Sequence, residues 1–504
     1  MSRARNSRTP EPVAAPPSSR PALPAFRELL SPREPYLVPL IALLVTRIVA
    51  WALIPNAAED AYITFRYARN FAVGNGLVFN PGEHVFGFSS PLWTVWSALG
   101  IRVLQDPVTW CKAWNVLFDA GALLLFTRML RARGLLPAWS FAWFFAVWPY
   151  FAATCASGME TSLMLFLVAL AATLSERRGP GAGIALGLLA LTRPEGLACA
   201  ALIAIPTRMR ERVIGLAIFV AGAAALFAYY GTIVPQSLVA KASIYGTPGP
   251  WLGRHWWEWI VPVVVGPGIA LNDTAYLTIL RMLMFPAAVV GVITLWPERR
   301  SALALAAASG ILVWLAYSVL GVAYFGWYLM LPLASIALAA AAGLPRVVRG
   351  PAIPLSAAVL VVTLWSAAHA LHRARAIAEY GIFGAVGNFL AGAATPGDRV
   401  FLEPIGIIGY LAPVTVIDEI GLVTPRIAER RRQGPGWYTD VVAAERPEWL
   451  AVRRGVVRTA QAFAGAGAPF RSLAERDTVF AGYDLVLKDE QETDLALLLF
   501  RRRP

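Results

Sequence analysis

Long apolar runs recur along the chain as far as residue 369, and clusters of arginine separate them. A helix needs about 20 apolar residues to cross the hydrocarbon core of a bilayer, and arginine clusters mark cytoplasmic loops. Because an even number of crossings must separate neighbouring clusters, we predict a polytopic α-helical membrane protein with about 11 spanning helices. The predicted spans are 36–54, 108–129, 136–153, 161–174, two half-length helices within 179–207, 213–230, 276–296, 302–319, 328–342 and 353–369.

The half-length pair is predicted because the stretch between Arg178 and Arg208 is too short for two full spans, although parity requires two. Its middle reads Arg193-Pro194-Glu195-Gly196, and we expect the two half-helices to meet there. Irregular backbone and charged side chains at membrane depth are tolerated only where they line a cavity enclosed by protein or filled with water. The motif therefore predicts a polar cavity between helices.

Parity also places one segment along the membrane surface. Counting 91–104 as a span would put the basic cluster at Arg128 outside the cytoplasm, so we assign this weakly amphipathic run to the interface. The segment 55–107 is then an external loop. Within it, residues 60–73 have the spacing of a second interfacial helix.

The pattern changes after His369, where short β-branched runs alternate with helical segments and turn signals. These features predict a soluble α/β domain over 372–504 on the extracytoplasmic face, because the last predicted span returns the chain to the outside. The final Arg501-Arg-Arg-Pro504 is expected to be solvated. The predicted strands are 399–402, 414–418 and 479–487.

Composition supports the membrane class, since 57% of the residues are hydrophobic and only 15% are charged, whereas soluble domains need about 25% charged residues. The net charge of +13 is concentrated on the tail and the membrane loops, so it indicates orientation and not nucleic-acid binding. Residues 1–35 are rich in Arg, Pro and Ser and are predicted to be a disordered cytoplasmic tail. Residues 36–371 then form the transmembrane module, a multi-pass unit of the plasma membrane.

Few metal-ligating or thiol groups stand in a functional pattern. The three cysteines all lie in apolar stretches, and the four histidines are scattered along the chain. No nucleotide-binding or metal-binding motif is present. The sequence therefore predicts no metal site and no required cofactor, although it does not exclude a divalent metal ion.

The densest polar cluster follows the first predicted span and contains Glu59, Asp60, Arg66 and Arg69. A carboxylate pair with basic residues one or two helical turns further on can deprotonate a hydroxyl while the guanidinium groups hold a phosphate. The alternative is structural, because acidic residues in the first turn of a helix stabilise it through the helix dipole. Spacing alone leaves both interpretations open.

Several motifs resemble those of the GT-C superfamily of polyprenyl-phosphate-sugar-dependent glycosyltransferases. Among its members, the chain is most similar to the actinobacterial cell-wall arabinofuranosyltransferases of the terminal β-(1→2) type. The motifs are Glu59-Asp-Ala-Tyr-Ile-Thr-Phe-Arg66, Gly74-Asn-Gly-Leu-Val-Phe-Asn80, Phe88-Ser-Ser-Pro-Leu-Trp93, Ser157-Gly-Met-Glu-Thr161, Leu191-Thr-Arg-Pro-Glu-Gly196, Tyr229-Tyr-Gly-Thr-Ile-Val-Pro235, Ala240-Lys-Ala242, Glu403-Pro-Ile-Gly-Ile-Ile-Gly-Tyr410 and Val416-Ile-Asp-Glu-Ile-Gly-Leu422.

The resemblance implies an inverting transfer of a sugar, arabinofuranose, from a polyprenyl-phosphate donor to a hydroxyl of an extracytoplasmic glycan or glycoconjugate. It places Asp60 as the general base and Glu59 where many relatives carry a second Asp. The partners implied are the lipid-linked donor, the glycan acceptor and membrane lipids, with no nucleic acid. The two interfacial helices of the superfamily match 60–73 and 91–104.

Further candidates for substrate or phosphate binding are Glu160, Arg193, Glu195 and Lys241, in addition to Arg66 and Arg69. Glu160 is either a partner of a helix dipole or a polar lining of the acceptor cleft. Arg193 and Glu195 either form a structural ion pair or face the active cavity. Lys241 either pairs with a lipid phosphate or is an exposed interfacial lysine.

Two other functions fit part of the pattern. A lipid-linked-sugar flippase or transporter with an external binding domain would also use a helix broken at Arg193-Pro194-Glu195-Gly196. No second broken helix in the other half of the chain accompanies it, which counts against a transporter. A non-catalytic scaffold whose soluble domain binds glycan would make the Asp60 region dispensable.

Overall fold

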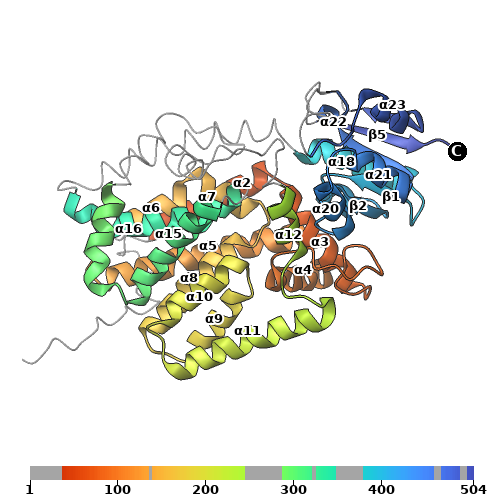
Figure 1. Ribbon diagram of the computed structural model, residues 1–504. Coiled ribbons are helices and arrows are strands. Elements are labelled where there is room, and N and C mark those ends of the chain that lie inside the picture. Colours follow the sequence, from red (N-terminus) through yellow and green to blue (C-terminus); the bar gives the residue numbers. More distant parts are fainter. Residues whose placement is uncertain are drawn as a thin grey trace, which may run out of the picture.

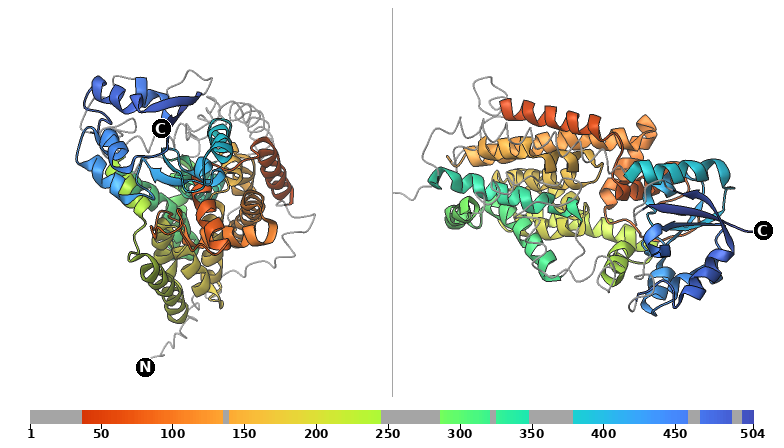
Figure 2. Two further views of the ribbon diagram at one scale, coloured as in Figure 1. Left: turned by 90° about the vertical axis from the view of Figure 1, so that its right-hand side faces the viewer. Right: turned by 90° about the horizontal axis from the view of Figure 1, so that it is seen from above.

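The protein consists of a bundle of long helices with a five-stranded sheet domain packed against one end (Figure 1). The view from above in Figure 2 shows the sheet domain, coloured blue, at the same end of the bundle. The computed structural model describes residues 37–134, 139–244, 286–320, 325–347, 379–458, 467–488 and 496–504. The predicted tail, the span 353–369 and the first part of the span 276–296 lie outside the described residues.

Most bundle helices lie close to the predicted spans, but the span predicted over 136–153 is divided into two short helices, Trp139–Val147 and Pro149–Ala156. Within the described ranges, four helices are long and apolar enough to cross a membrane, or five if one bent pair is counted as a single span. The total of about 11 therefore stays a prediction. The bundle helices are α2 (Leu37–Leu53), α5 (Pro107–Arg131), α6 (Trp139–Val147), α7 (Pro149–Ala156), α8 (Thr161–Glu176), α9 (Ala182–Ala190), α10 (Pro194–Ala204), α11 (Met209–Tyr230), α15 (Ala302–Leu320) and α16 (Met330–Val347).

The predicted break at Arg193 is confirmed. Helix α9 has 9 residues and α10 has 11, and Arg193 between them has extended backbone at the N-cap of α10. Pro194 occupies the first position of α10, where its missing N–H is not needed by the helix. The sequence therefore places an arginine and a glutamate at a helix break inside the bundle.

A second break separates α7 from α8, whose axes differ by 110°. The connecting residues include Gly158, which has a φ of +77°, a left-handed conformation that L side chains rarely adopt. The break leaves Glu160 at the N-cap of α8. Together the two breaks bring polar side chains to the same end of the bundle.

The external loop forms two helices, α3 (Glu59–Ala72) and α4 (Pro91–Leu104), close to the predicted ranges. A third short helix, α12 (Gln236–Ile244), follows α11. Helix α3 is packed inside the protein, with 10 of its 14 residues buried, and its place at the membrane interface stays a prediction. The soluble domain covers it, a contact that cannot be read from helical spacing.

The soluble domain contains a mixed sheet in the order β2-β1-β3-β5-β4. Strand β1 pairs in parallel with β2 and β3, whereas β5 runs antiparallel to β3 and β4. The strands are β1 (Arg399–Leu402), β2 (Thr415–Asp418), β3 (Trp449–Arg453), β4 (Tyr483–Lys488) and β5 (Leu497–Arg502), and the helices are α18 (Glu379–Ala393), α19 (Gly406–Leu411), α20 (Pro425–Arg432), α21 (Trp437–Glu445), α22 (Arg454–Arg458) and α23 (Leu473–Ala481).

The predictions of β1 and β2 are confirmed, but the predicted strand 479–487 is wrong at its start. Residues up to Ala481 belong to α23, and the strand begins only at Tyr483. Ser472 caps this helix by accepting a hydrogen bond from the N–H of Glu475 at 3.1 Å, a contact that stabilises a helix beginning there. The stabilisation of the helix by this cap outweighs the strand preference of the β-branched residues Thr478 and Val479 near its end.

Candidate functional site

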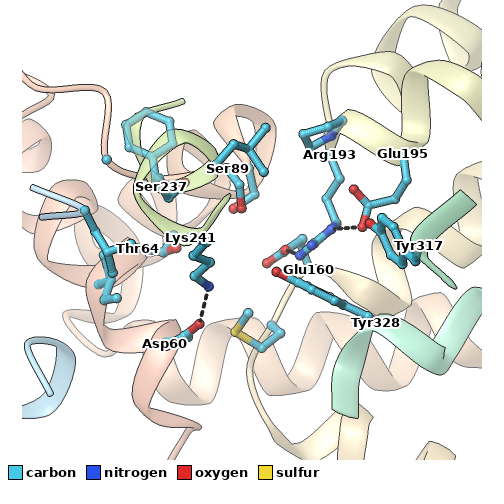
Figure 3. Close-up of a pocket in the computed structure, with 18 of the residues that line it drawn as sticks. Asp60, Thr64, Ser89, Glu160, Arg193, Glu195, Ser237, Lys241, Tyr317 and Tyr328 are labelled. Atoms are coloured by element: carbon cyan, nitrogen blue, oxygen red, sulfur yellow. Dashed lines mark hydrogen bonds and ion pairs between the residues drawn. The ribbon is translucent and has the colours of Figure 1, made fainter. Parts of the chain in front are cut away.

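A cavity of about 360 Å³ lies where the two helix breaks, the external helices and the soluble domain meet. This volume falls in the range of about 300–1,000 Å³ that is typical of small-molecule sites. Figure 3 shows that its labelled side chains come from segments far apart in the sequence and point toward a common space. Its ionisable lining side chains are Asp60, Glu160, Arg193, Glu195, Lys241, Tyr317 and Tyr328.

Asp60 and Lys241 form one polar pair in this cavity. The Nζ of Lys241 lies 3.3 Å from Oδ2 of Asp60, and the two side chains are 18% and 26% exposed. Burial alone would lower the pKa of Lys241, but the neighbouring Tyr328 and Asp60 outweigh it and raise that pKa. Asp60 is therefore a carboxylate that is open to the cavity and adjacent to a cation.

Asp60 lies in the first turn of α3, where the helix-dipole interpretation also places it, but it does not act as a hydrogen-bonding cap. Helix α3 has Ala58 at its N-cap, and no side chain caps that end. The recorded hydrogen-bond partner of the Asp60 carboxylate is the ammonium group of Lys241. Asp60 thus faces the cavity, where a substrate group could meet it.

Arg193 forms the centre of a second cluster. Its Nε lies 2.7 Å from Glu195, and its Nη1 pairs with the carboxylate of Glu160. The guanidinium group also lies 5.1 Å from the ring centroid of Tyr328. Oε2 of Glu160 has no hydrogen-bond partner among the described residues, although this side chain is only 1% exposed. One positive and two negative charges leave the cluster with a net charge of −1.

Because Arg193 also pairs with Glu160, replacing Arg193 and Glu195 together should have a different effect on stability from that of an isolated ion pair. If Arg193 paired with Glu195 alone, the double variant Arg193→Met, Glu195→Gln would be milder than either single variant. Because Glu160 would keep its buried charge without a cation, we expect the double variant to keep most of the loss of about 3–5 kcal/mol that Arg193→Met alone causes. Thermal unfolding in detergent measures this, and Arg193→Met with Glu160→Gln should recover more of the loss, because Glu160 is 1% exposed and Glu195 is 8% exposed. A double variant at Arg193 and Glu195 with wild-type stability would contradict the expectation.

The structure places Glu59 outside the cavity lining. Its carboxylate accepts hydrogen bonds from the backbone N–H groups of Gly406 and, at 2.8 Å, Ile407, which begin helix α19 of the soluble domain. A negative charge at a helix N-terminus is stabilising. A Cβ at position 406 would come within 2.1 Å of the Glu59 carbonyl oxygen, so only glycine fits there. Glu59 therefore joins α3 to the soluble domain.

Arg66 also lies outside the cavity lining, and it is 3% exposed. It donates hydrogen bonds to the backbone oxygens of Phe79, Gly409 and Val414 and to Oδ1 of Asn80. These acceptors occupy its donor groups, so the phosphate contact expected from the sequence is replaced by a structural role. The distant acceptors lie in a different domain, which spacing within α3 does not reveal.

Two more side chains, Arg69 and Asn80, join the external loop to the soluble domain. Arg69 donates to the carbonyl oxygen of Tyr410 at 2.6 Å and lies 4.5 Å from the centroid of the same ring. The amide of Asn80 pairs with both the N–H and the carbonyl group of Val416, at 3.0 and 2.8 Å. Val416 belongs to β2, one of the two edge strands of the sheet. Asn80 therefore satisfies backbone groups that an edge strand would otherwise leave free.

Sequence reasoning missed several residues that line the cavity. Ser237, Tyr317 and Tyr328 were not among the candidates, nor was Leu422 of the soluble domain. Leu422 does lie in a motif that carried the resemblance, and Ser237 precedes Lys241 by one helical turn. Within the described ranges, no group of three or more His, Cys, Asp or Glu residues could hold a metal ion.

Comparisons with known proteins give one match to a family model and several to solved structures. A domain of unknown function (DUF8728) matches residues 370–495. No match is found among curated protein sequences. The structure of ArnT from Cupriavidus metallidurans bound to undecaprenyl phosphate aligns with a TM-score of 0.60 and 11% identity, covering 92% of this chain and 97% of that one.

Two further solved structures were compared. The apo state of the same ArnT aligns with a TM-score of 0.59 and 12% identity, with the same coverage of 92% and 97%. Arabinofuranosyltransferase AftD from Mycobacteria aligns with a TM-score of 0.47 and 15% identity over 92% of this chain and 40% of that one. The likeness to ArnT, together with the apolar helices and the C-terminal sheet, assigns this chain the fold of the polytopic GT-C membrane proteins, with a C-terminal α/β domain.

Proposed function

We propose that this protein is a membrane glycosyltransferase that transfers a sugar from a polyprenyl-phosphate donor to a hydroxyl of an extracytoplasmic glycan or glycoconjugate. The observation that carries the proposal is the cavity carboxylate of Asp60 paired with the ammonium group of Lys241. The fold supports it, because the ArnT structure with a similar fold holds undecaprenyl phosphate. Membrane lipids surround the bundle in this proposal, and no metal is assigned a role.

In the proposed reaction, Asp60 accepts the proton of the acceptor hydroxyl as that oxygen attacks the anomeric carbon. The bond from the anomeric carbon to the phosphate oxygen breaks, and its electron pair leaves with the lipid phosphate. A single displacement of this kind inverts the anomeric configuration. Lys241 stabilises the charge that gathers on the phosphate, as a pre-placed cation does at a leaving group.

The pairing of Lys241 with Asp60 gives the donor a second effect. A phosphate that binds the Lys241 ammonium group competes with the Asp60 carboxylate for the same hydrogen-bond donors. The carboxylate is then free to accept a proton from the acceptor. We propose that donor binding in this way prepares the base for the reaction.

The charges assign Arg193 a different role from the one expected from the sequence. Its cluster with Glu160 and Glu195 has a net charge of −1 and would repel a phosphate. Carboxylates are good acceptors for hydroxyl groups, and Oε2 of Glu160 has no partner among the described residues. We therefore propose that Lys241 contacts the phosphate and that Glu160 contacts sugar hydroxyl groups.

The sugar proposed is arabinofuranose, and its support is the resemblance of motifs such as Glu59-Asp-Ala-Tyr-Ile-Thr-Phe-Arg66. The experiment that tests the function incubates the purified full chain with labelled polyprenyl-phospho-arabinofuranose and a synthetic glycan acceptor. Transfer of the label to the acceptor is expected. Movement of the lipid across vesicles without transfer would instead identify a flippase, and binding alone would identify a scaffold.

The proposed orientation has a cytoplasmic N-terminus and an extracytoplasmic soluble domain in the plasma membrane. The native cysteines Cys111, Cys155 and Cys199 are buried, so introduced cysteines can be labelled selectively. On intact cells, a membrane-impermeant maleimide is expected to label Asp477→Cys in the soluble domain and to spare Arg177→Cys, because Arg177 belongs to a predicted cytoplasmic cluster. Labelling of both positions from the same side would overturn the topology.

A further inference from the structure

Helix α5 carries three buried polar residues on one face. Lys112, Asn115 and Asp119 are 1%, 0% and 0% exposed, and spacings of three and four residues place them one above the other on a helix. Polar groups inside a membrane bundle are costly, and ionisable ones are usually functional. None of the three lines the cavity, so their role must be exerted on other residues.

Lys112 binds the segment that leads to Asp60. Its Nζ donates to the carbonyl oxygens of Ile54 and Asn56 at 2.5 and 2.7 Å. Helix α2 ends at Leu53 and α3 begins at Glu59. The ammonium group therefore fixes the connection between these helices, a few residues before the proposed base.

Asn115 binds the segment that leads to Glu160. Its Nδ2 donates to the carbonyl oxygens of Cys155 and Met159 at 3.1 and 2.9 Å. These two carbonyl groups lie on either side of Gly158, where α7 and α8 bend by 110°. One amide group thus bridges the break, and the residue that follows Met159 is the cavity carboxylate.

The two segments are also joined to each other and to the bundle. The N–H of Ala58 donates to the carbonyl oxygen of Ser157 at 2.8 Å. Further along α5, Asp119 pairs with Arg47 of α2 at 2.9 Å, with both side chains fully buried. Arg47 also donates to the carbonyl oxygens of Phe145 and Ala146 in α6. Helix α5 is therefore held firmly against its neighbours.

We infer that Lys112 and Asn115 are positioning residues, which set the places of Asp60 and Glu160 across the cavity. A single rigid helix contacts both connecting segments, so its polar face fixes the separation of the two carboxylates. The inference rests on the proposed function for what is positioned, but the bracing itself is independent of that function. A misplacement of about 1 Å in such a group lowers turnover by roughly 100-fold.

The test compares turnover in Asn115→Leu and Lys112→Met with that in a matched control. Thr127→Val is the control, because Thr127 is also buried on α5 but donates only to Leu123 of its own helix. We expect turnover to fall roughly 10- to 100-fold in the two test variants and to stay within about two-fold in the control. Binding of polyprenyl phosphate should stay within about two-fold in all three.

A double-variant cycle separates positioning from a general loss of structure. In a Glu160→Ala background, which removes the acceptor oxygens, Asn115→Leu should cost little further turnover, because the group it positions is already absent. Lys112→Met should likewise cost little in an Asp60→Asn background. If the losses multiply in both backgrounds, the residues act separately and the inference fails.

Hydrogen–deuterium exchange gives a readout that does not require activity. Asn115→Leu is expected to speed amide exchange in residues 157–164, whereas Thr127→Val should not. Unchanged amide exchange in folded Asn115→Leu would overturn the positioning role of Asn115, even if sugar transfer is observed. If the wild-type chain transfers no sugar but the Asn115→Leu variant still exchanges faster than wild type, only the proposed function is overturned. If Asn115→Leu does not fold, Asn115→Ser is judged by the same exchange measurement.

Discussion

Replacing Asp60 by asparagine is expected to lower the rate of sugar transfer by roughly 10²–10⁴-fold, because the amide cannot accept the acceptor proton. The variant keeps the shape of the side chain, and Lys241 can still donate to the amide oxygen. Binding of polyprenyl phosphate should therefore change little. Steady-state transfer kinetics and a separate donor-binding measurement distinguish the two effects.

Two neighbouring changes serve as controls for Asp60. Asp60→Glu should recover little activity, because a carboxylate displaced by one methylene misses the reacting geometry. Glu59→Gln should cost less, since Glu59 binds the N-terminus of α19 and points away from the cavity. Full transfer activity in folded Asp60→Asn would remove the catalytic role and leave Asp60 as a residue that only stabilises α3.

Replacing Arg66 by methionine is expected to give the largest loss of stability among single changes in the external loop. The change leaves the carbonyl oxygens of Gly409 and Val414 without this donor, whereas the oxygens of Phe79 and Asn80 keep a second donor each. Each buried polar group that loses its partner costs about 1–3 kcal/mol. The soluble domain should therefore separate from α3 at lower temperature, which limited proteolysis during thermal unfolding measures.

Arg69→Met is the matched comparison, because this arginine donates a hydrogen bond to the carbonyl oxygen of Tyr410 in the soluble domain and is only partly buried. It should destabilise the chain less than Arg66→Met. A phosphate-binding role for Arg66 would give the opposite pattern, with normal stability and weakened donor binding. That result would contradict the structural role assigned to this side chain.

The sequence predicted the parts of the site that depend on local physics. The break at Arg193 followed from helix length and charge parity, and the structure places Arg193 in the cavity. Asp60 and Lys241 were both candidates, and they lie 3.3 Å apart although 181 residues separate them. The break was predictable because a membrane constrains helix length and the placement of charge strongly, whereas the roles of Asp60 and Lys241 stay predictions.

The parts that the sequence did not predict depend on contacts between distant segments. The sequence placed Arg66 one to two helical turns after Asp60, but it did not reveal that Val414 and Gly409 would occupy its donors. Strand β3 was missed because it is buried along most of its length, so its residues show no alternation of polar and apolar positions. Glu160 was a candidate by itself, but it was not recognised as the ion-pair partner of Arg193, because 33 residues and a helix break separate the two.

The long separation between α3 and its partners has a consequence for biogenesis. Glu59 and Arg66 each bind residues that follow them by 348 positions in the chain. At a synthesis rate of about 5–20 residues per second, this interval corresponds to roughly 20–70 s. During that time the external loop has left the ribosome, but the strand edge and helix N-terminus that cover α3 do not yet exist. A nascent chain therefore has no finished cavity until the segment that carries Ile407, Val414 and Leu422 has been made.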